Sequence, residues 1–298
     1  MTKFKGVFAP IPIPFKADES VDFDSLSKNL DKWIASSLAG VVMPGSNSEA
    51  PYINDQERAD IWKVVGGKFK TSGKLFIAGT GLETTKDTIE QTVLSAQYGA
   101  CATLIVPPNY YKGQMTHEVL VKHYTAVADA SPIPIFVYNI PQFSGIDFTL
   151  DTLLAMAEHP NIVGIKDSSS NILKMTSLLS QRPDFIVFAG TGAAVLPFLS
   201  VGSPGNITAF ANFGSESISK IMDAFAAGDM LQARKLQLAI TALNTCVTSK
   251  YGIPGLKYAM DQLGYYGGPS RRPLLPVSQS AKAEIDRHIR KLREQSYL

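Results

Sequence analysis

The chain contains the stretch Asn161-Ile162-Val163-Gly164-Ile165-Lys166-Asp167-Ser168-Ser169-Ser170, an apolar, β-branched run that ends in a lysine. Such a run is typical of a strand that is covered on both faces, as in a parallel sheet. Polar residues take over at Asp167, so we predict that the strand stops just after the lysine. Because side chains alternate along a strand, one predicted face carries Ile162, Gly164, Lys166 and Ser168.

Lys166 has two interpretations. Lysine is rarely buried completely unless it has a partner or a function. At the mouth of an apolar site, desolvation disfavours the ammonium form, and the free amine can then attack a ketone to form a Schiff base. Alternatively, the aliphatic stem lies along the strand end while the ammonium group reaches water. The stretch alone leaves both interpretations open.

Seven other short apolar runs recur along the chain, separated by helical patterns. The lysine strand is the sixth in order, and the other predicted strands cover residues 6–11, 40–43, 74–78, 102–106, 133–138, 185–189 and 206–210. Strict alternation of strands and helices favours a parallel sheet with helices outside it. Eight such units predict an α/β fold of the (β/α)8 TIM-barrel class. A doubly wound dinucleotide-binding sheet is the alternative, but Gly79-Thr80-Gly81 and Gly190-Thr191-Gly192 lack the third glycine of its fingerprint.

The pattern changes after the eighth predicted strand. From residue 215 to about 263 it becomes helical, a turn-rich break follows at 264–269, and a last helix is predicted at 280–293. We therefore predict two parts, a (β/α)8 barrel over residues 1–214 and a C-terminal helical extension over residues 215–298 packed on the barrel.

The composition excludes several classes of protein. The 298 residues carry a net charge of +2, which gives no reason to expect nucleic acid or an anionic membrane as a partner. Two cysteines make no disulfide framework, and no apolar run reaches the roughly 18 residues that a membrane helix needs. The first residues lead directly into a strand, which predicts a cytoplasmic protein, or a mitochondrial one only if a transit peptide has been removed.

In a barrel of this kind, functional residues lie at the C-terminal ends of the strands. Tyr138 and Lys166 end adjacent predicted strands, so we expect them side by side, where a tyrosine can carry protons for an imine-forming lysine. Each candidate also has a structural interpretation. Tyr138 could be a rim aromatic whose hydroxyl meets water, and Ser46 and Asn47 could serve only as turn residues.

The sequence resembles the family of pyruvate-dependent class I aldolases and lyases typified by dihydrodipicolinate synthase and N-acetylneuraminate lyase. Residues 41–49 look like the family's Gly-Thr/Ser-x-Gly-Glu loop. Tyr138-Asn139-Ile140-Pro141 matches its tyrosine motif, and Gly164-Ile165-Lys166-Asp167-Ser168 matches its Schiff-base motif. Within the family, the chain is most similar to 4-hydroxy-2-oxoglutarate aldolase, which shares the Gly-Ser-Asn loop and the segments 251–257 and 264–269.

The resemblance implies a role for each matching residue. Lys166 would form the Schiff base with pyruvate or with the 2-oxo acid that is cleaved, and Tyr138 would carry protons. Ser46 would link Tyr138 to a Tyr110 that reaches in from a neighbouring subunit, which implies a homo-oligomer built as a dimer of dimers. The remaining residues implied at the substrate site are Ser46, Asn47, Ser168, Gly190 and Ile207. The imine replaces any cofactor, and the four histidines form no metal-binding pair.

Two positions depart from the family pattern. Phe143 stands where dihydrodipicolinate synthase uses an arginine to bind the carboxylate of its second substrate, and phenylalanine cannot make that contact. This departure counts against lysine biosynthesis. Ser48 replaces the loop glycine of the family, and it would be strained if that position needs a positive φ.

The chemistry leaves several functions open. We expect a small 2-oxo acid and an aldehyde as partners, with cleavage of 4-hydroxy-2-oxoglutarate to pyruvate and glyoxylate as the first candidate. A 2-keto-3-deoxy sugar acid aldolase or dehydratase is the alternative, and Phe143 suits a second substrate without a carboxylate at that place. A phosphate-binding barrel isomerase, with residues 190–192 as the phosphate loop, and a non-catalytic binding barrel are further alternatives.

Overall fold

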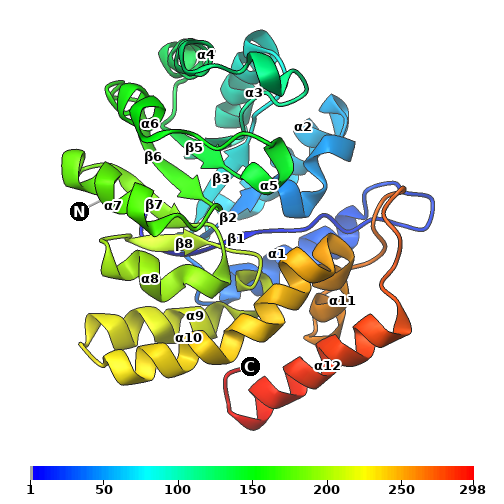
Figure 1. Ribbon diagram of the computed structural model, residues 1–298. Helices are drawn as coiled ribbons and strands as arrows, with labels where there is room; N and C mark the ends of the chain where they lie inside the picture. The colour runs from blue at the N-terminus through cyan, green and yellow to red at the C-terminus, as the bar shows by residue number, and fades with distance from the viewer. Residues whose placement is uncertain (1–2) are drawn as a thin grey trace.

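The computed structural model describes residues 3–298. Its centre is a closed barrel in which each strand pairs in parallel with the next and the last pairs with the first (Figure 1). The strands are β1 Gly6–Pro10, β2 Gly40–Met43, β3 Leu75–Gly79, β4 Ala102–Ile105, β5 Ile135–Asn139, β6 Ile162–Asp167, β7 Ile186–Ala189 and β8 Gly205–Ile207. The predicted (β/α)8 barrel is therefore confirmed.

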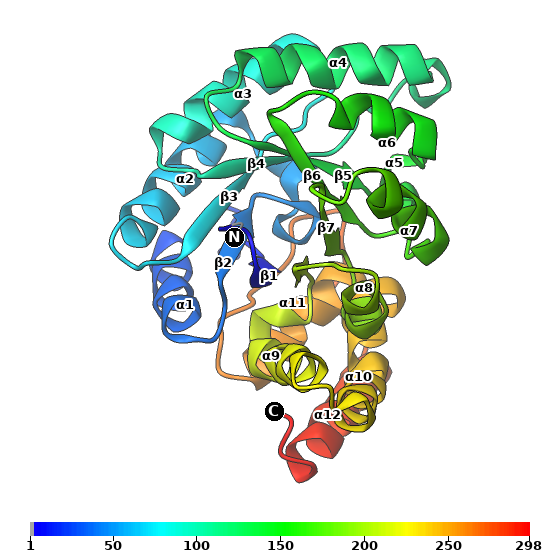
Figure 2. The same cartoon turned by 90° about the vertical axis from the view of Figure 1, so that its left-hand side faces the viewer.

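Helices surround the strands, as the view in Figure 2 shows. They are α1 Phe23–Ala35, α2 Asp55–Phe69, α3 Thr85–Gln97, α4 His117–Ala130, α5 Pro141–Ser144, α6 Leu150–Ala157, α7 Ile172–Gln181, α8 Val195–Ser200 and α9 Ala211–Ala226. Asn54 and Glu57 form a capping box at the start of α2. The short helix α5, directly after the tyrosine strand, was not predicted because four residues carry no helical period.

The C-terminal part continues with α10 Met230–Thr245, a π-helical turn at Cys246–Lys250, α11 Gly252–Gln262 and α12 Gln279–Glu294. Helix α9 begins before the expected boundary at residue 214, and Gly214 interrupts its helical geometry (φ −125°, ψ 32°). Buried side chains of α9 to α12 share one hydrophobic core with side chains of α1, α2 and the strands β1 to β3. Within the described residues, no helix combines the length and apolarity that a bilayer crossing needs.

The barrel interior is filled by large apolar side chains, among them Phe8, Phe136 and Phe188, and the ring of Phe188 contacts the rings of the other two. Gly164 faces this space between Phe136 and Ile186. A Cβ at Gly164 would lie 2.3 Å from the Ile186 carbonyl oxygen and 2.8 Å from the Phe136 ring, so only glycine fits there. The small residue makes room for the aromatic packing beneath Lys166.

A register shift in β6 corrects the predicted face of the lysine strand. Ile162 pairs with Ile135, but the next pair is Gly164 with Phe136, so Val163 is an extra residue. Ile162 therefore packs in the cluster on the helix side of the barrel, whereas Gly164 and Lys166 face inward. The prediction that Ile162 shares their face was wrong because a bulge resets the alternation.

The eighth strand is shorter than predicted. Pairing ends at Ile207, and the expected continuation to residue 210 is a turn in which the Ala211 amide donates to the Thr208 carbonyl. The apolar residues of this turn resemble a strand in sequence because they are buried at the start of α9.

Candidate active site

Lys166 and Tyr138 are register partners on the adjacent strands β6 and β5. Lys166 is only 3% exposed, and its Nζ lies 4.1 Å from the centre of the Tyr138 ring. Phe188 of β7 is its register partner on the other side. Among the described residues, no carboxylate lies within ion-pair distance of this amine. A buried amine with aromatic walls and no counter-charge is unusual for a purely structural lysine.

A polar network fixes the ends of the two strands on the side away from the barrel interior. The Asn139 amide donates to Asp167 at 2.7 Å and to Asp147 at 2.8 Å. Asp167 also accepts from the Ser169 hydroxyl and the Ser170 amide, and Lys174 pairs with Asp147. Because Asn139 and Asp167 each follow one residue of the Tyr138–Lys166 pair, these bonds hold the two side chains in register. Local sequence patterns do not predict this network, because its members come from four segments.

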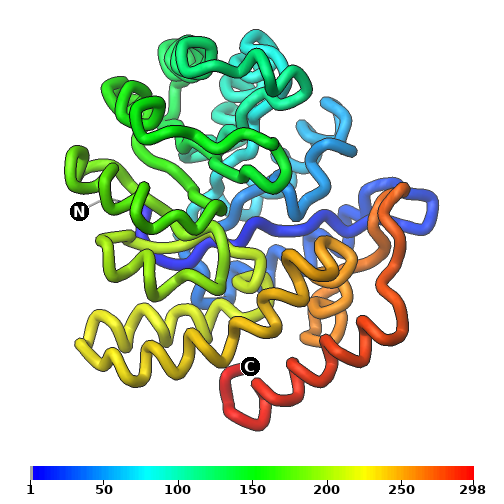
Figure 3. The backbone as a smooth tube through the Cα atoms, in the orientation of Figure 1, coloured from blue at the N-terminus to red at the C-terminus, as the bar shows by residue number. Residues whose placement is uncertain are grey.

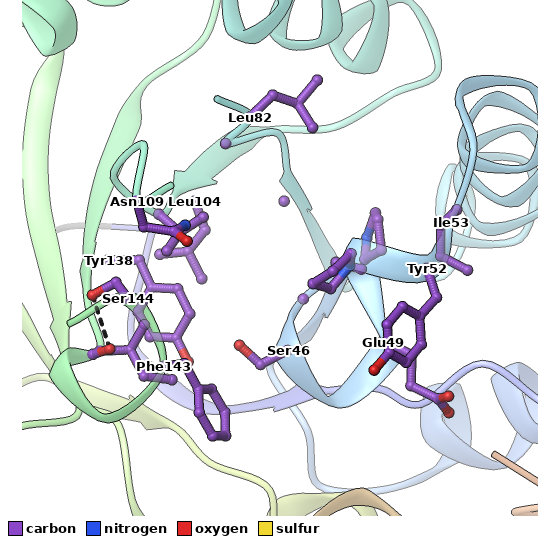
Figure 4. Close-up of a pocket in the computed structure, with 18 of the residues that line it drawn as sticks. Ser46, Glu49, Tyr52, Ile53, Leu82, Leu104, Asn109, Tyr138, Phe143 and Ser144 are labelled. Carbon is purple, nitrogen blue, oxygen red and sulfur yellow. Dashed lines mark hydrogen bonds between the residues drawn. The ribbon is translucent and has the colours of Figure 1, made fainter. Parts of the chain in front are cut away.

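The loop after β2 presents Ser46 at the start of a short 3₁₀ turn, Ser46–Ser48. The Asn47 amide donates to the Pro10 carbonyl at 3.1 Å, and the buried Ser48 hydroxyl donates to Ile11 and accepts from the Gly45 amide. These bonds attach the loop to the end of β1 and leave the Ser46 side chain facing the cavity (Figure 4). The Asn47 side chain thus faces the barrel wall rather than the cavity.

The strain expected at Ser48 lies one residue further on. Ser48 does not have a positive φ, whereas Glu49 has φ 58° and ψ 39°, the left-handed conformation. Glu49 is buried, and its carboxylate pairs with Lys257 of α11 at 2.7 Å. Ser48 therefore occupies the position of the family's glycine without a positive φ. The left-handed conformation falls on Glu49, whose side chain is held in place by Lys257.

A cavity of about 550 Å³ opens at this end of the barrel. Ser46, Tyr138 and Phe143 line it, and in Figure 4 the Ser46 hydroxyl points across the cavity toward Tyr138. Its apolar walls come from Leu104, Val106, Ile140 and Ile253, the last from the C-terminal extension. Phe143, on the short helix α5, is 68% exposed at the mouth. The cavity has the size and apolar character of a small-molecule site.

Arg58 of α2 also lines the cavity and was not predicted. It is buried, its Nη1 donates weakly to the Gly79 carbonyl at 3.4 Å, and its Nε has no hydrogen-bond partner among the described residues. Burial lowers the pKa of the guanidinium, and Asp55 opposes that shift. A buried cation without an ion pair suits a cavity that receives an anion. The sequence held no signal for it, because Arg58 follows a helix cap as surface arginines do.

Lys166 and the other expected site residues Ser168, Gly190, Ile207 and Tyr110 are not among the residues that line this cavity. The Gly190 amide donates to the Asp167 carbonyl, and a Cβ at Gly190 would lie 2.1 Å from the Ser168 hydroxyl, so Ser168 covers that glycine. Ile207 is buried in the same interior cluster as Tyr138. Tyr110 is 77% exposed, and its ring packs edge-on against Tyr111.

One group in the extension has the residue types of a metal site. The ligand atoms of Cys246, Glu284 and His288 lie within 4.8 Å of one another. The Glu284 carboxylate, however, already accepts from Lys250 at 2.6 Å and from the Tyr251 hydroxyl at 2.6 Å. These contacts lower the pKa of Glu284 to about 2, and the bonded ammonium group of Lys250 balances the charge of the carboxylate.

The closed barrel and the cavity at its mouth are those of a barrel enzyme, and the relatives of this chain make it an enzyme of the lyase class. The chain belongs to the dihydrodipicolinate synthetase family, whose model matches residues 3–292. This finding agrees with the resemblance of the three motifs.

The relatives divide between two activities. The chain is 35% identical over 284 residues to a probable mitochondrial 4-hydroxy-2-oxoglutarate aldolase of Emericella nidulans, covering 93% of this chain and 92% of the relative. It is 30% identical to a 4-hydroxy-tetrahydrodipicolinate synthase of an Exiguobacterium species, covering 95% and 96%. Among solved structures it resembles a dihydrodipicolinate synthase of Acinetobacter baumannii complexed with pyruvate (TM-score 0.90, 28% identity, 99% of each chain). Family and fold are thereby shown.

Proposed function

We propose that this protein is a class I aldolase that cleaves 4-hydroxy-2-oxoglutarate to pyruvate and glyoxylate through an imine on Lys166. The observation that carries the proposal is the buried amine of Lys166, 4.1 Å from the Tyr138 ring and without a counter-charge. The name of the Emericella nidulans relative supports the choice of substrate. Arg58 supports an acidic substrate, because it places a cation without an ion pair in the cavity that Ser46 and Tyr138 line.

The reaction follows from these groups. The Lys166 amine attacks the C2 carbonyl of the substrate, and the carbinolamine loses water to give a protonated imine. Tyr138 takes the proton from the C4 hydroxyl, and the electrons of the C3–C4 bond move into the imine, so the aldehyde leaves and an enamine remains. Protonation of the enamine at C3 and hydrolysis release pyruvate and restore the amine. The imine is the electron sink, so we propose no metal or organic cofactor.

A second candidate is a 2-keto-3-deoxy sugar acid aldolase or dehydratase, which would use the same imine. The observation in its favour is Phe143, an exposed apolar side chain at the mouth where the synthase has an arginine. Comparing kcat/KM for 4-hydroxy-2-oxoglutarate with that for a six-carbon 3-deoxy-2-oxo acid separates the two. The first candidate requires the five-carbon diacid to be preferred.

The experiment that tests the shared chemistry is borohydride reduction in the presence of pyruvate, followed by intact mass and peptide mapping. We expect one pyruvyl adduct per chain, located on Lys166. Folded protein that gains no adduct, or gains it on another lysine, would contradict the proposal.

Tyr138→Phe should lower kcat for aldol cleavage by about 10²- to 10⁴-fold, the usual contribution of a positioned proton carrier. The ring remains against Lys166, so the barrel packing should be unchanged. Steady-state kinetics of pyruvate release provides the measurement, with thermal unfolding as the control for folding. A variant with full activity would remove Tyr138 from the mechanism.

We also propose that the active form is a homo-oligomer, built as a dimer of dimers, in which Tyr110 completes the site of a neighbouring subunit. Its 77% exposure in the single chain leaves the ring available for such a contact. Tyr110→Phe should reduce turnover by about tenfold to a hundredfold, since a proton relay is interrupted. Sedimentation at the assay concentration checks the assembly, and a fully active monomer would refute it.

A further inference from the structure

We infer that Lys257 and Glu49 are positioning residues, through which the C-terminal extension holds the loop that carries Ser46. The inference rests on the proposed function, because it assumes that the Ser46 hydroxyl acts in the reaction. It goes further in making α11 part of the catalytic apparatus. The evidence is an ion pair that joins the two parts of the chain at the cavity wall, to which Glu49 belongs.

The pair is buried and short. The Lys257 Nζ lies 2.7 Å from the Glu49 carboxylate, and both side chains are almost completely removed from solvent. Lys257 also donates to the Pro269 carbonyl at 2.8 Å and lies 4.5 Å from the centre of the Phe15 ring. Burial lowers the pKa of Lys257, and Glu49 opposes the shift. A buried pair of this kind is weak evidence for stability alone, because desolvation offsets much of the attraction.

The left-handed backbone conformation of Glu49 has to be stabilised by contacts with other parts of the chain. Its φ of 58° is a conformation that non-glycine residues adopt at an energetic cost and keep only when their surroundings enforce it. The Glu49 amide donates to the Ser46 carbonyl at 3.1 Å, so the conformation of Glu49 closes the turn that presents Ser46. If the side chain were released, the turn could relax and move the hydroxyl.

A second contact from the same extension acts on the same loop. The Arg271 amide donates to the other Glu49 oxygen at 2.8 Å, and its guanidinium donates to the Tyr52 carbonyl at 2.6 Å and pairs with Glu57. In Figure 3 the orange segment between α11 and α12 passes beside the blue N-terminal part of the chain. Both carboxylate oxygens of Glu49 therefore contact the C-terminal extension, and the two contacts together fix the position of its side chain.

The test separates positioning from stability with three variants. Lys257→Met leaves Glu49 buried and uncompensated, so we expect it to lose both stability and turnover. Glu49→Gln with Lys257→Met removes both charges, which should recover most of the stability. The double variant should nevertheless keep a loss in kcat/KM of about tenfold to a hundredfold, since small displacements of catalytic groups cost that much. Lys250→Met, which breaks the partly exposed pair with Glu284 in the same extension, is the matched control and should change neither.

Two readouts decide the inference, both taken at a temperature where every variant is folded. Hydrogen exchange of the amides at residues 45–49 should accelerate in the double variant, while β2 stays protected. Unchanged exchange in the loop, or a loss of kcat/KM smaller than tenfold, overturns the inference. If the proposed function is wrong, borohydride traps no pyruvate on Lys166 of the wild-type protein. Hydrogen exchange at residues 45–49 would still show whether the Lys257–Glu49 pair holds the loop.

Discussion

Lys166→Met should lower aldol cleavage by about 10⁴-fold or more, the scale on which removal of a covalent nucleophile acts. Methionine has a similar length, so it fills the space between Tyr138 and Phe188 without the amine. It also removes a buried polar group that has no ion-pair partner, so the variant should be at least as stable as the wild type. Continuous measurement of pyruvate release, with urea unfolding in parallel, gives both numbers.

The control for this prediction is Lys122→Met, which changes an exposed lysine paired with Glu118 on α4. It should retain wild-type turnover and the pyruvyl adduct. Borohydride should trap no pyruvate on the Lys166→Met protein. Measurable turnover by that variant, above the rate of contaminating enzyme, would rule out an imine mechanism at this residue.

Phe188→Ala should reduce the free energy of unfolding by about 3–5 kcal/mol, the cost of emptying a large aromatic site in a packed core. Phe188 is completely buried in the barrel interior, with ring centres 5.5 Å from Phe8 and 5.4 Å from Phe136. The neighbouring side chains belong to different strands of a closed barrel, so they cannot collapse into the space. The shift of the urea midpoint at constant slope measures the loss.

Phe143→Ala is the matched control for the same chemical change. Its side chain is 68% exposed on α5, so its removal should alter the free energy of unfolding by less than about 0.5 kcal/mol. The pair of variants distinguishes the packed interior from the cavity mouth. Equal destabilisation by both would mean that the interior contacts are not what holds the barrel together.

The neighbouring positions of Tyr138 and Lys166 follow from rules that are local in sequence. Parallel alternation places consecutive strands side by side, so the expectation that Tyr138 and Lys166 are neighbours needed only the strand order. The bulge at Val163 and the left-handed Glu49 were not predictable in this way. Both depend on how the strand and the loop fit their neighbours, and the residues themselves are compatible with ordinary geometry.

The sequence by itself determined the barrel, the order of its strands, the cap that starts α2 and the family of the protein. It did so because alternation, capping and motif residues act over a few positions. Only the tertiary structure decided that Glu49 pairs with Lys257, that Arg58 faces the cavity and that Phe143 lies exposed at its mouth. These features depend on segments that are far apart in the chain. Closure of the barrel and packing of the extension bring those segments together. Local sequence does not specify the partner of a buried charge, which is set by this tertiary packing.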